Sequence, residues 1–576
     1  MNKFCYLATA AFLVFMFSAC QPSREPDVSA IAPSQSVVET GKSLFFYNCV
    51  ACHNFERDGI GPHLAGITKQ TSTDWLKAFI QDPKGVIDSG DDRASGVFAR
   101  FNSYMPGFPH FSEAEQNALI AYIDTYRNTL VQTGEVDHEK LLDPVPGSIP
   151  ESDIAIGLDF VFQIPPSSEQ VPRTRITKLE SHPNTGDLYM LDLNGLLYQI
   201  KNGRVKSYMN MAEQMPGFIR APGLATGFGS FAFHPEFERN GLLYTAHSEP
   251  AGSAPADFSY DDSIPVTLQW VVQEWKTSTP EAVPFSGKPR ELFRINMVVQ
   301  YHGVQNLAFN PNAQPGDKDY GNLYIGIGDG GSVERGFEFL ADGPTVPWGS
   351  IFRINPAGKN SRNEQYGIPE NNPFHDKETV PEIYAHGFRN PHRFSWSKAA
   401  NGKPGKMIAA NIGHHNIESL VVVEPGLNYG WPYREGAFEI RPHGNMGNVY
   451  ALPDDDARFN FTYPAAQYDH DEGNAICGGY VYQGQAIPEL QGKYIFGDIV
   501  NGRVFYVETD KLRNGVNSPI YELQLSFEGE KTSLLTLSGE DRAQLRMGTD
   551  QAGEIYVFSK NDGKVYKFTT AEKPPE

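Results

Sequence analysis

The alternation of hydrophobic and polar residues changes character along the 576-residue chain. An apolar run from Tyr6 to Phe17 stands near the beginning, and a polar stretch with prolines and serines follows it. Between residues 112 and 130, apolar residues recur near helical spacing behind Ser112-Glu113-Ala114-Glu115, which is a typical helix start. From about residue 155 onward, short apolar strands follow glycine turns. The pattern therefore predicts a helix after residue 112 and a long series of β-strands after residue 155.

One phrase recurs through residues 155–571: a glycine turn, then an apolar-aromatic strand, and often a second strand. Some copies lead directly into a hairpin turn, as at Asn194-Gly195 and Asp562-Gly563. Irregularly spaced copies of one strand pair favour a β-propeller with long loops between its blades, and an all-β sandwich is the alternative. The copies begin at Gly186, Gly241, Gly321, Gly492 and Gly553.

Composition and charge narrow the possible functions. The formal net charge of −21 argues against nucleic acid and anionic membrane surfaces as partners. The 55 glycines, 42 prolines and 27 tyrosines favour many short strands over helix bundles. Among the five cysteines, Cys5 and Cys20 lie in the N-terminal segment and Cys477 stands alone. We therefore expect no structural disulfide, and we expect Cys477 to be a small buried apolar residue.

The two remaining cysteines belong to the motif Cys49-Val50-Ala51-Cys52-His53. Two thiols at this spacing followed by a histidine are typical of covalent c-type haem attachment, in which the histidine binds the iron. We expect His53 and Met105 to be the two axial ligands, Met105 lying in a proline-containing turn. The alternatives are a zinc half-site or a redox dithiol, and a surface methionine at position 105. Zinc would need a second pair of ligands, for which the chain has no matching motif.

The apolar run near the beginning predicts a signal peptide. It follows Lys3, is too short to span a bilayer as a stable helix, and ends in small residues. Its ending, Phe17-Ser18-Ala19-Cys20, resembles a bacterial lipobox, which implies lipidation of Cys20. Residue 21 is Gln and not the Asp that is associated with inner-membrane retention, so we expect an anchor in the outer membrane facing the periplasm. The alternative is simple cleavage, which would give a soluble periplasmic protein.

Each of the two globular regions resembles a known protein family. Residues 38–130 resemble a class I cytochrome c through the haem motif, Gly61-Pro62-His63-Leu64, the Met105 turn and the helix after residue 112. Residues 155–571 resemble the glucose/sorbosone dehydrogenase family, whose members are six-bladed propellers that bind pyrroloquinoline quinone (PQQ) and calcium. The phrases that carry this resemblance are Phe231-Ala232-Phe233-His234-Pro235, Asn306-Leu307-Ala308-Phe309, Gly328-Asp329-Gly330-Gly331, His386-Gly387-Phe388-Arg389-Asn390-Pro391 and Asn428-Tyr429-Gly430-Trp431-Pro432.

The expected fold class follows from both resemblances. A small all-α cytochrome c domain (38–130) precedes an all-β propeller (155–571), for which six blades would fit the length. Residues 1–19 are the expected signal peptide, residues 20–37 a tether and residues 131–154 a linker between the domains.

The resemblance to the dehydrogenases implies roles for individual residues. It places the catalytic base at His302, and imidazole suits this role because it titrates near working pH. It makes Arg389, Asn390 and, more loosely, Arg546 ligands of PQQ, whose three carboxylates call for cationic donors. The family often has an aspartate immediately before the catalytic histidine, where this chain has Tyr301.

The same resemblance implies calcium sites. The loop Ile412–Asn416 corresponds to the family's calcium loop, so Gly413 and His414 are expected to bind calcium through their backbone carbonyls. Glu418 and Tyr429 resemble residues at a further, structural calcium site, and ordinary packing is the alternative for both.

Taken together, these features predict a quinohaemoprotein dehydrogenase. An aldose sugar or a related aldehyde or alcohol would give a hydride to PQQ, and electrons would pass to haem c and then to a separate one-electron carrier. The alternative is an electron-transfer protein whose propeller only binds a ligand or partner. An eight-bladed alcohol dehydrogenase is set aside because the chain has 6 tryptophans and no adjacent cysteines. Membrane contact is expected only through the lipid anchor.

Overall fold

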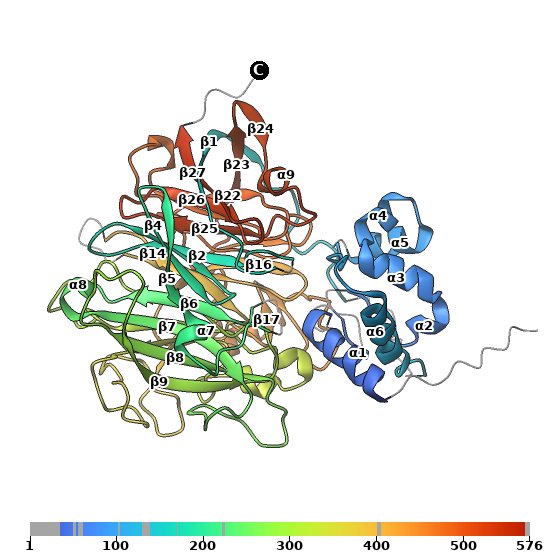
Figure 1. The fold of residues 1–576 in the computed structure, drawn as a ribbon, viewed down its shortest axis with the longest axis horizontal. Coiled ribbons are helices and arrows are strands. Elements are labelled where there is room, and N and C mark those ends of the chain that lie inside the picture. The colour runs from blue at the N-terminus through green and yellow to red at the C-terminus, as the bar shows by residue number, and fades with distance from the viewer. Residues whose placement is uncertain are drawn as a thin grey trace, which may run out of the picture.

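The computed structural model describes residues 35–49, 53–55, 61–101, 104–128, 139–169, 171–221, 225–399 and 405–570. A small helical domain lies beside a larger domain of β-strands (Figure 1). None of the described helices is both long and apolar enough to cross a membrane. The expected signal peptide, Cys20 and Cys52 of the expected haem motif lie outside the described residues.

The helical domain is built around the crossing of its first and last helices, α1 (Gln35–Asn48) and α6 (Glu113–Asp124). A Cβ at Gly41 would stand 1.8 Å from the Ala118 carbonyl oxygen, so only glycine permits this close approach. Ser112 and Glu115 form a capping box, which confirms the predicted helix start, and the helix gives way to turns at Thr125. Between these helices lie α2 (Ile67–Gln70), α3 (Thr73–Gln81), α4 (Pro83–Asp88) and α5 (Asp92–Phe101).

The second domain is a β-propeller of four-stranded antiparallel units, and the sandwich alternative is wrong. Among the described residues, three units are separate sheets and three more are joined into one 13-stranded sheet. The first separate sheet contains β6 (Phe228–Phe233), β7 (Leu242–Pro250), β8 (Leu268–Lys276) and β9 (Lys288–Met297). The second contains β10 (Val304–Phe309), β11 (Leu323–Ile327), β12 (Ser350–Ile354) and β13 (Ile383–His386). The third contains β14 (Pro391–Trp396), β15 (Met407–Asn411), β16 (Ile417–Val423) and β19 (Ala466–Asp469).

The joined sheet closes the ring of units. Strand β1 (Glu151–Gln163) pairs antiparallel with β27 (Lys564–Thr570) and parallel with β23 (Tyr521–Phe527), so the first strand of the domain completes its last unit. The other strands of this sheet are β2 (Ile176–Ser181), β3 (Leu188–Asp192), β4 (Leu196–Lys201), β5 (Arg204–Asn210), β20 (Tyr480–Val481), β21 (Lys493–Gly497), β22 (Val504–Glu508), β24 (Glu530–Thr532), β25 (Leu545–Thr549) and β26 (Ile555–Ser559). Short elements on the loops are α7 (Met211–Gln214), α8 (Phe237–Asn240), α9 (Leu534–Ser538), η1 (Val333–Arg335), η2 (Glu338–Ala341), η3 (Asp456–Phe459), η4 (Pro488–Leu490), β17 (Arg434–Glu435) and β18 (Phe438–Glu439).

The recurring glycine phrase marks one position in these units. Each glycine that begins a copy has a positive φ, between 64° and 84°, and stands just before the second strand of its unit. Glycine fits there because it adopts the left-handed conformation without a steric penalty. The strands that follow the five glycines are β3, β7, β11, β21 and β26.

The first strands of the units lie against one another at the propeller axis. Lys178 on β2 donates to the backbone carbonyls of Phe231 on β6 and Leu307 on β10, at 2.8 and 2.7 Å. Arg393 on β14 donates to the Thr177 carbonyl on β2 at 3.0 Å. The segment that follows β11 meets the segment that leads into β14, because the Asp329 amide donates to the Arg389 carbonyl at 2.8 Å. The axis is therefore polar and tightly bonded, with several candidate site residues at one end.

Candidate haem pocket and active site

The helical domain encloses a cavity of about 240 Å³ that is lined by Cys49, His53 and Met105. Cys49 is buried at the C-terminal end of α1, and the His53 amide donates to its carbonyl at 2.9 Å. His53 Nδ1 lies 2.8 Å from the Pro62 carbonyl oxygen. Because a carbonyl can only accept a hydrogen bond, Nδ1 carries the proton and Nε2 keeps its lone pair for a metal.

The walls of this cavity fit a haem. Gly61 permits the close approach of the chain to the imidazole, since a Cβ there would stand 2.3 Å from His53 Cε1. The two expected axial residues line one space, and the remaining walls are mostly apolar. These walls include Leu64, Ile67, Trp75, Leu76, Phe79, Ile80, Val97, Phe98, Leu119 and Ile123.

At the propeller axis, His302 and Asp329 form a hydrogen-bonded pair. His302 Nδ1 lies 2.7 Å from Asp329 Oδ1, and the carboxylate is completely buried. Trp431 Nε1 donates to Asp329 Oδ2 at 3.0 Å, and the Gly331 amide donates to Oδ1 at 2.8 Å. The aspartate therefore holds the imidazole with Nδ1 protonated, which leaves Nε2 as the basic nitrogen.

The backbone and the electrostatics of His302 are both unusual. Its φ is +54°, a left-handed conformation that non-glycine residues rarely adopt and that is enriched at functional sites. Burial lowers the pKa of His302, and the nearby Arg389 guanidinium lowers it further, against the opposing influence of Asp329. The imidazole is therefore neutral at physiological pH and available as a base.

Arg389 lies in the same site and is already engaged by the protein. Its guanidinium donates to the Glu334 carboxylate and to the Gly413 carbonyl, while its Nε is buried without a hydrogen-bond partner in the described residues. Glu334 also accepts from the Tyr301 hydroxyl at 2.5 Å and lies 3.3 Å from His414 Nδ1. Burial would raise the pKa of Glu334, but Arg389 and the histidines hold it well below its usual range.

Asn390 and Arg389 are positioned by one side chain. The Asn411 side-chain oxygen, at the end of β15, accepts from the backbone amides of both residues at 3.1 Å. Asn390 itself is buried, and its carbonyl accepts from the Ile412 amide at 3.1 Å. This arrangement brings the predicted pair to the loop that contains Gly413.

The loop around Gly413 wraps a buried carboxylate. Glu435 Oε1 accepts from the backbone amides of His414, His415, Asn416 and Ile417, at distances between 2.7 and 3.0 Å. Because these amides point toward Glu435, the Gly413 carbonyl is free to turn toward Arg389, which donates to it. Backbone carbonyls presented in this way are suitable calcium ligands.

Glu418 and Tyr429 have other partners in this structure. The buried Glu418 carboxylate accepts from the amides of Gly413 and Ile476, at 3.2 and 2.9 Å, and lies 3.2 Å from His470 Nε2. The Tyr429 hydroxyl donates to the Val422 carbonyl at 2.7 Å and accepts from the Glu424 amide at 3.1 Å. Glu418 thus braces the Gly413 loop, whereas Tyr429 braces the end of β16.

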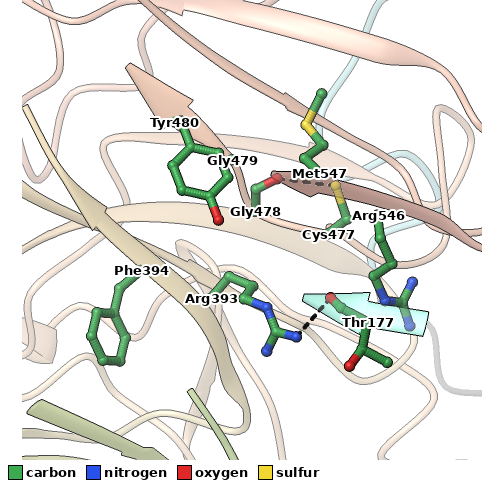
Figure 2. Close-up of a pocket in the computed structure, with 9 residues that line it drawn as sticks. All are labelled: Thr177, Arg393, Phe394, Cys477, Gly478, Gly479, Tyr480, Arg546 and Met547. Carbon is green, nitrogen blue, oxygen red and sulfur yellow. Dashed lines mark hydrogen bonds between the residues drawn. The ribbon is translucent and has the colours of Figure 1, made fainter. Parts of the chain in front are cut away.

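Arg546 lines a small axial cavity together with Arg393 and Cys477 (Figure 2). Burial and the neighbouring Arg393 lower the pKa of Arg546 to about 10, and its Nε has no hydrogen-bond partner in the described residues. Burial also lowers the pKa of nearby Lys560 well below its usual value, and the guanidiniums of Arg175 and Arg546 add to this effect. Buried cations that repel one another suit a ligand with several negative charges. Cys477 is buried as expected, and burial raises the pKa of its thiol to about 12.

Several residues of the site escaped prediction. Asp329 and Trp431 stand in phrases that the sequence singled out, so an aspartate after a buried strand was an available signal. Glu334 and Glu435 had no such signal, because each reaches its partners across a loop.

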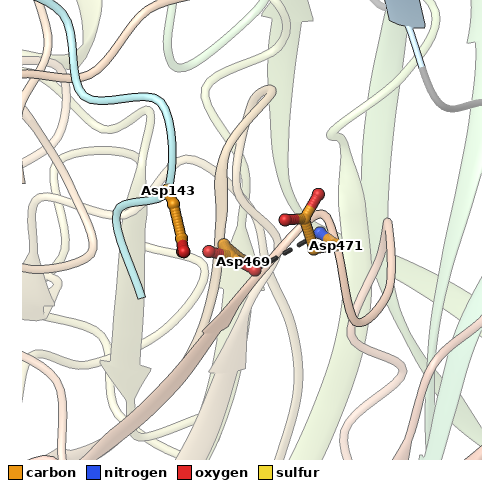
Figure 3. A group of neighbouring side chains, drawn as sticks. All are labelled: Asp143, Asp469 and Asp471. Carbon is orange, nitrogen blue, oxygen red and sulfur yellow. Dashed lines mark hydrogen bonds between the residues drawn. The ribbon is translucent and has the colours of Figure 1, made fainter. Parts of the chain in front are cut away.

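An acidic group lies where the linker meets the propeller. Within the described residues, only Asp143, Asp469 and Asp471 form a group of three or more potential metal-ligating side chains, with ligand atoms within 4.8 Å (Figure 3). Asp469 accepts from the backbone amides of Val145 and Asp471, at 3.0 and 3.3 Å. The group thereby fastens the linker to β19.

Comparison with known proteins agrees with the two domains. The model of the glucose/sorbosone dehydrogenase family matches residues 181–567, and that of cytochrome c matches residues 38–127. HIPL1 protein of Arabidopsis thaliana is 26% identical over 386 residues, and human Hedgehog-interacting protein is 23% identical over 424 residues. These matches cover 60% and 70% of this chain, but the chain spans only 52% of the length of either relative.

A solved structure described as glucose dehydrogenase shares the fold. It is 17% identical, has a TM-score of 0.50, and the match covers 72% of this chain and 99% of the other. The family model covers more than half of the chain and includes the His302, Arg389 and Gly413 segments. The protein therefore belongs to the glucose/sorbosone dehydrogenase family and carries a cytochrome c domain in front of its propeller.

Proposed function

We propose that this protein oxidises an aldose sugar, or a related aldehyde or alcohol, at the propeller axis and passes the electrons to haem c in the helical domain. The observation that carries the proposal is the buried His302–Asp329 pair, which presents a neutral imidazole beside a cationic site. Both features serve a hydride-transfer dehydrogenase that uses an anionic organic cofactor.

His302 is the proposed base. Because Nδ1 is hydrogen-bonded to Asp329, Nε2 accepts the proton of the substrate hydroxyl while hydride leaves the carbon that bears this hydroxyl. The Asp329 carboxylate then stabilises the imidazolium, and Trp431 and Gly331 keep that carboxylate in place. The hydrogen bond to Asp329 holds the direction of the ring, on a residue whose backbone is left-handed.

The cationic residues near His302 suit PQQ, which carries three carboxylates. When bound, PQQ would accept the two electrons of the hydride. Arg389, Asn390 and Arg546 are the proposed contacts, because the two arginines have buried Nε atoms without hydrogen-bond partners in the described residues. Calcium is proposed at the backbone carbonyls of Gly413 and His414, where amides of the same loop face away toward Glu435. Arg389 would have to exchange or share its contacts to Glu334 and Gly413.

Haem c, attached through Cys49 and Cys52 with His53 and Met105 as axial ligands, would supply one-electron transfer to a separate carrier. His53 is prepared for this role by its hydrogen bond to the Pro62 carbonyl. We also propose that lipidation at Cys20 holds the protein at the outer membrane, with both domains in the periplasm.

The test is sugar-driven reduction of the haem in the full-length protein supplied with PQQ and calcium. His302→Ala should slow aldose-driven haem reduction by about 10²- to 10⁴-fold, which is the usual contribution of a general base. His375→Ala removes an exposed histidine and should behave as the wild type. Dithionite should reduce the haem equally in all three proteins. Equal sugar-driven rates in His302→Ala and the wild type would show that the base is another group.

Recognition of a protein partner is a second candidate function. It is favoured by the similarity to human Hedgehog-interacting protein. It is also favoured by the contacts of Arg389, because this proposed cofactor ligand already donates to Glu334 and to the Gly413 carbonyl. Titration of the apoprotein with PQQ in the presence of calcium separates the two functions. Saturable binding that permits aldose oxidation supports the dehydrogenase, whereas the absence of PQQ binding in a folded, haem-loaded protein supports recognition.

A further inference from the structure

One arginine of the propeller reaches the haem pocket. Arg542, in the segment that leads into β25, lines the cavity that contains Cys49, His53 and Met105. The other described residues around this cavity all come from the helical domain. The Nε atom of Arg542 is buried and has no hydrogen-bond partner in the described residues. A guanidinium edge is thus presented to the haem space from the neighbouring domain.

The helical domain packs against the propeller. Buried apolar residues of both domains, among them Phe45 and Leu119 of the helical domain and Tyr301 and Leu340 of the propeller, belong to one hydrophobic cluster. The hydrogen bond to Asp88 is the main cause that raises the pKa of Lys84 on α4, and Asp541, the neighbour of Arg542, makes a smaller contribution. Burial and the Tyr126 hydroxyl raise the pKa of Tyr122 on α6, and Arg335 of η1, the neighbour of Glu334, opposes this rise. The helical domain therefore lies near η1, whose Glu334 binds Arg389, and near the segment that contains Arg542.

We propose that Arg542 binds a propionate of the haem and so joins the propeller to the redox group of the helical domain. A haem brings two carboxylates into a cavity whose walls are mostly apolar, and guanidinium pairs with carboxylate through parallel hydrogen bonds. The cavity's own arginines have other contacts: Arg93 donates to Gln70 at 3.2 Å, and Arg100 lies 5.0 Å from the centre of the Phe101 ring.

The backbone holds Arg542 in position. The Ala543 amide donates to the Val500 carbonyl at 2.9 Å, and the Gln544 carbonyl accepts from the Lys560 amide at 3.0 Å. Gln544 has a φ of +52°, so the chain turns sharply between Arg542 and the start of β25. This turn directs Arg542 to the haem cavity while Arg546, on β25, lines the axial cavity. One short segment thus contributes a cation to each site.

The test measures the midpoint potential of the haem in full-length holoprotein by spectroelectrochemistry. A fixed positive charge favours the reduced haem, so Arg542→Gln should lower the equilibrium constant for ferric haem reduction about tenfold, a shift of ~59 mV to lower potential. Arg542→Lys keeps the charge and should restore most of the potential, whereas Arg542→Glu should lower it further. Arg513→Gln removes an exposed propeller arginine as the matched control and should match the wild type.

The proposal depends on haem attachment, which the pyridine haemochrome spectrum of each variant checks, and not on sugar oxidation. A potential that follows the charge at residue 542 supports the contact. Equal potentials in the wild type, Arg542→Gln and Arg542→Glu overturn it. A drop of the same size in the lysine, glutamine and glutamate variants also overturns it, because this result indicates a loss of packing and not of charge.

Discussion

At the scale of single residues, the His302–Asp329 pair makes a prediction about pH. Burial and Arg389 lower the pKa of His302, and Asp329 opposes them, so activity should be present above that pKa and lost as the pH falls through it. Asp329→Asn removes the opposing charge, which should move the acid limb of kcat/KM to lower pH. It should also reduce kcat about 100-fold or more, because the imidazole loses the group that orients it. The measurement is the pH profile of sugar-driven haem reduction, with Asp376→Asn, an exposed site, as control. An unchanged acid limb in Asp329→Asn would show that another group titrates.

At the scale of elements, the parts that could be predicted are those with a local cause. The five glycine turns were readable because each needs a positive φ beside an apolar strand, and the start of α6 was readable from its capping box. By contrast, the position of Glu334 on Arg389 and that of Glu435 in the Gly413 loop depend on how separate loops meet. Contacts between separate loops leave no periodic pattern of hydrophobic and polar residues in the sequence. The role of β1 was hidden for the same reason, since its partners β23 and β27 lie at the other end of the domain.

The closing strand carries a prediction about stability. Ile156 on β1 is completely buried and faces Leu525 on β23 and Thr570 on β27 in register. Ile156→Ala should lower the free energy of unfolding of the propeller by about 2–5 kcal/mol, the usual cost of this truncation in a core. Phe160→Ala, at a half-exposed position of the same strand, should cost less than about 1 kcal/mol. Denaturant unfolding followed by far-ultraviolet circular dichroism measures the free energy of unfolding of both variants. Equal losses in the two variants would contradict a buried, stabilising role for β1 between β23 and β27.

At the scale of the whole molecule, the fusion of a dehydrogenase propeller to a cytochrome c keeps two sites together. The helical domain packs against the propeller near Tyr301, the neighbour of His302, because buried residues of both domains belong to one hydrophobic cluster. A short covalent link gives an effective concentration of about 1 mM. Electron transfer from the propeller to the haem should therefore be independent of protein concentration, in contrast to a dehydrogenase that meets a separate cytochrome by diffusion.

This expectation can be tested by cutting the chain between the domains. A protease site introduced within residues 131–138, which lie between α6 and β1, would separate the domains without altering either site. After cleavage, sugar-driven haem reduction at 1 µM protein should slow by up to about 10³-fold, the ratio of the effective to the actual concentration, and should become dependent on dilution. The same protease site placed after residue 571 gives a cut that leaves the domains joined, and its rate should not change. If the separated domains still transfer electrons at the uncut rate on dilution to nanomolar concentration, the packing between the domains suffices to hold them together, and the covalent link has another purpose.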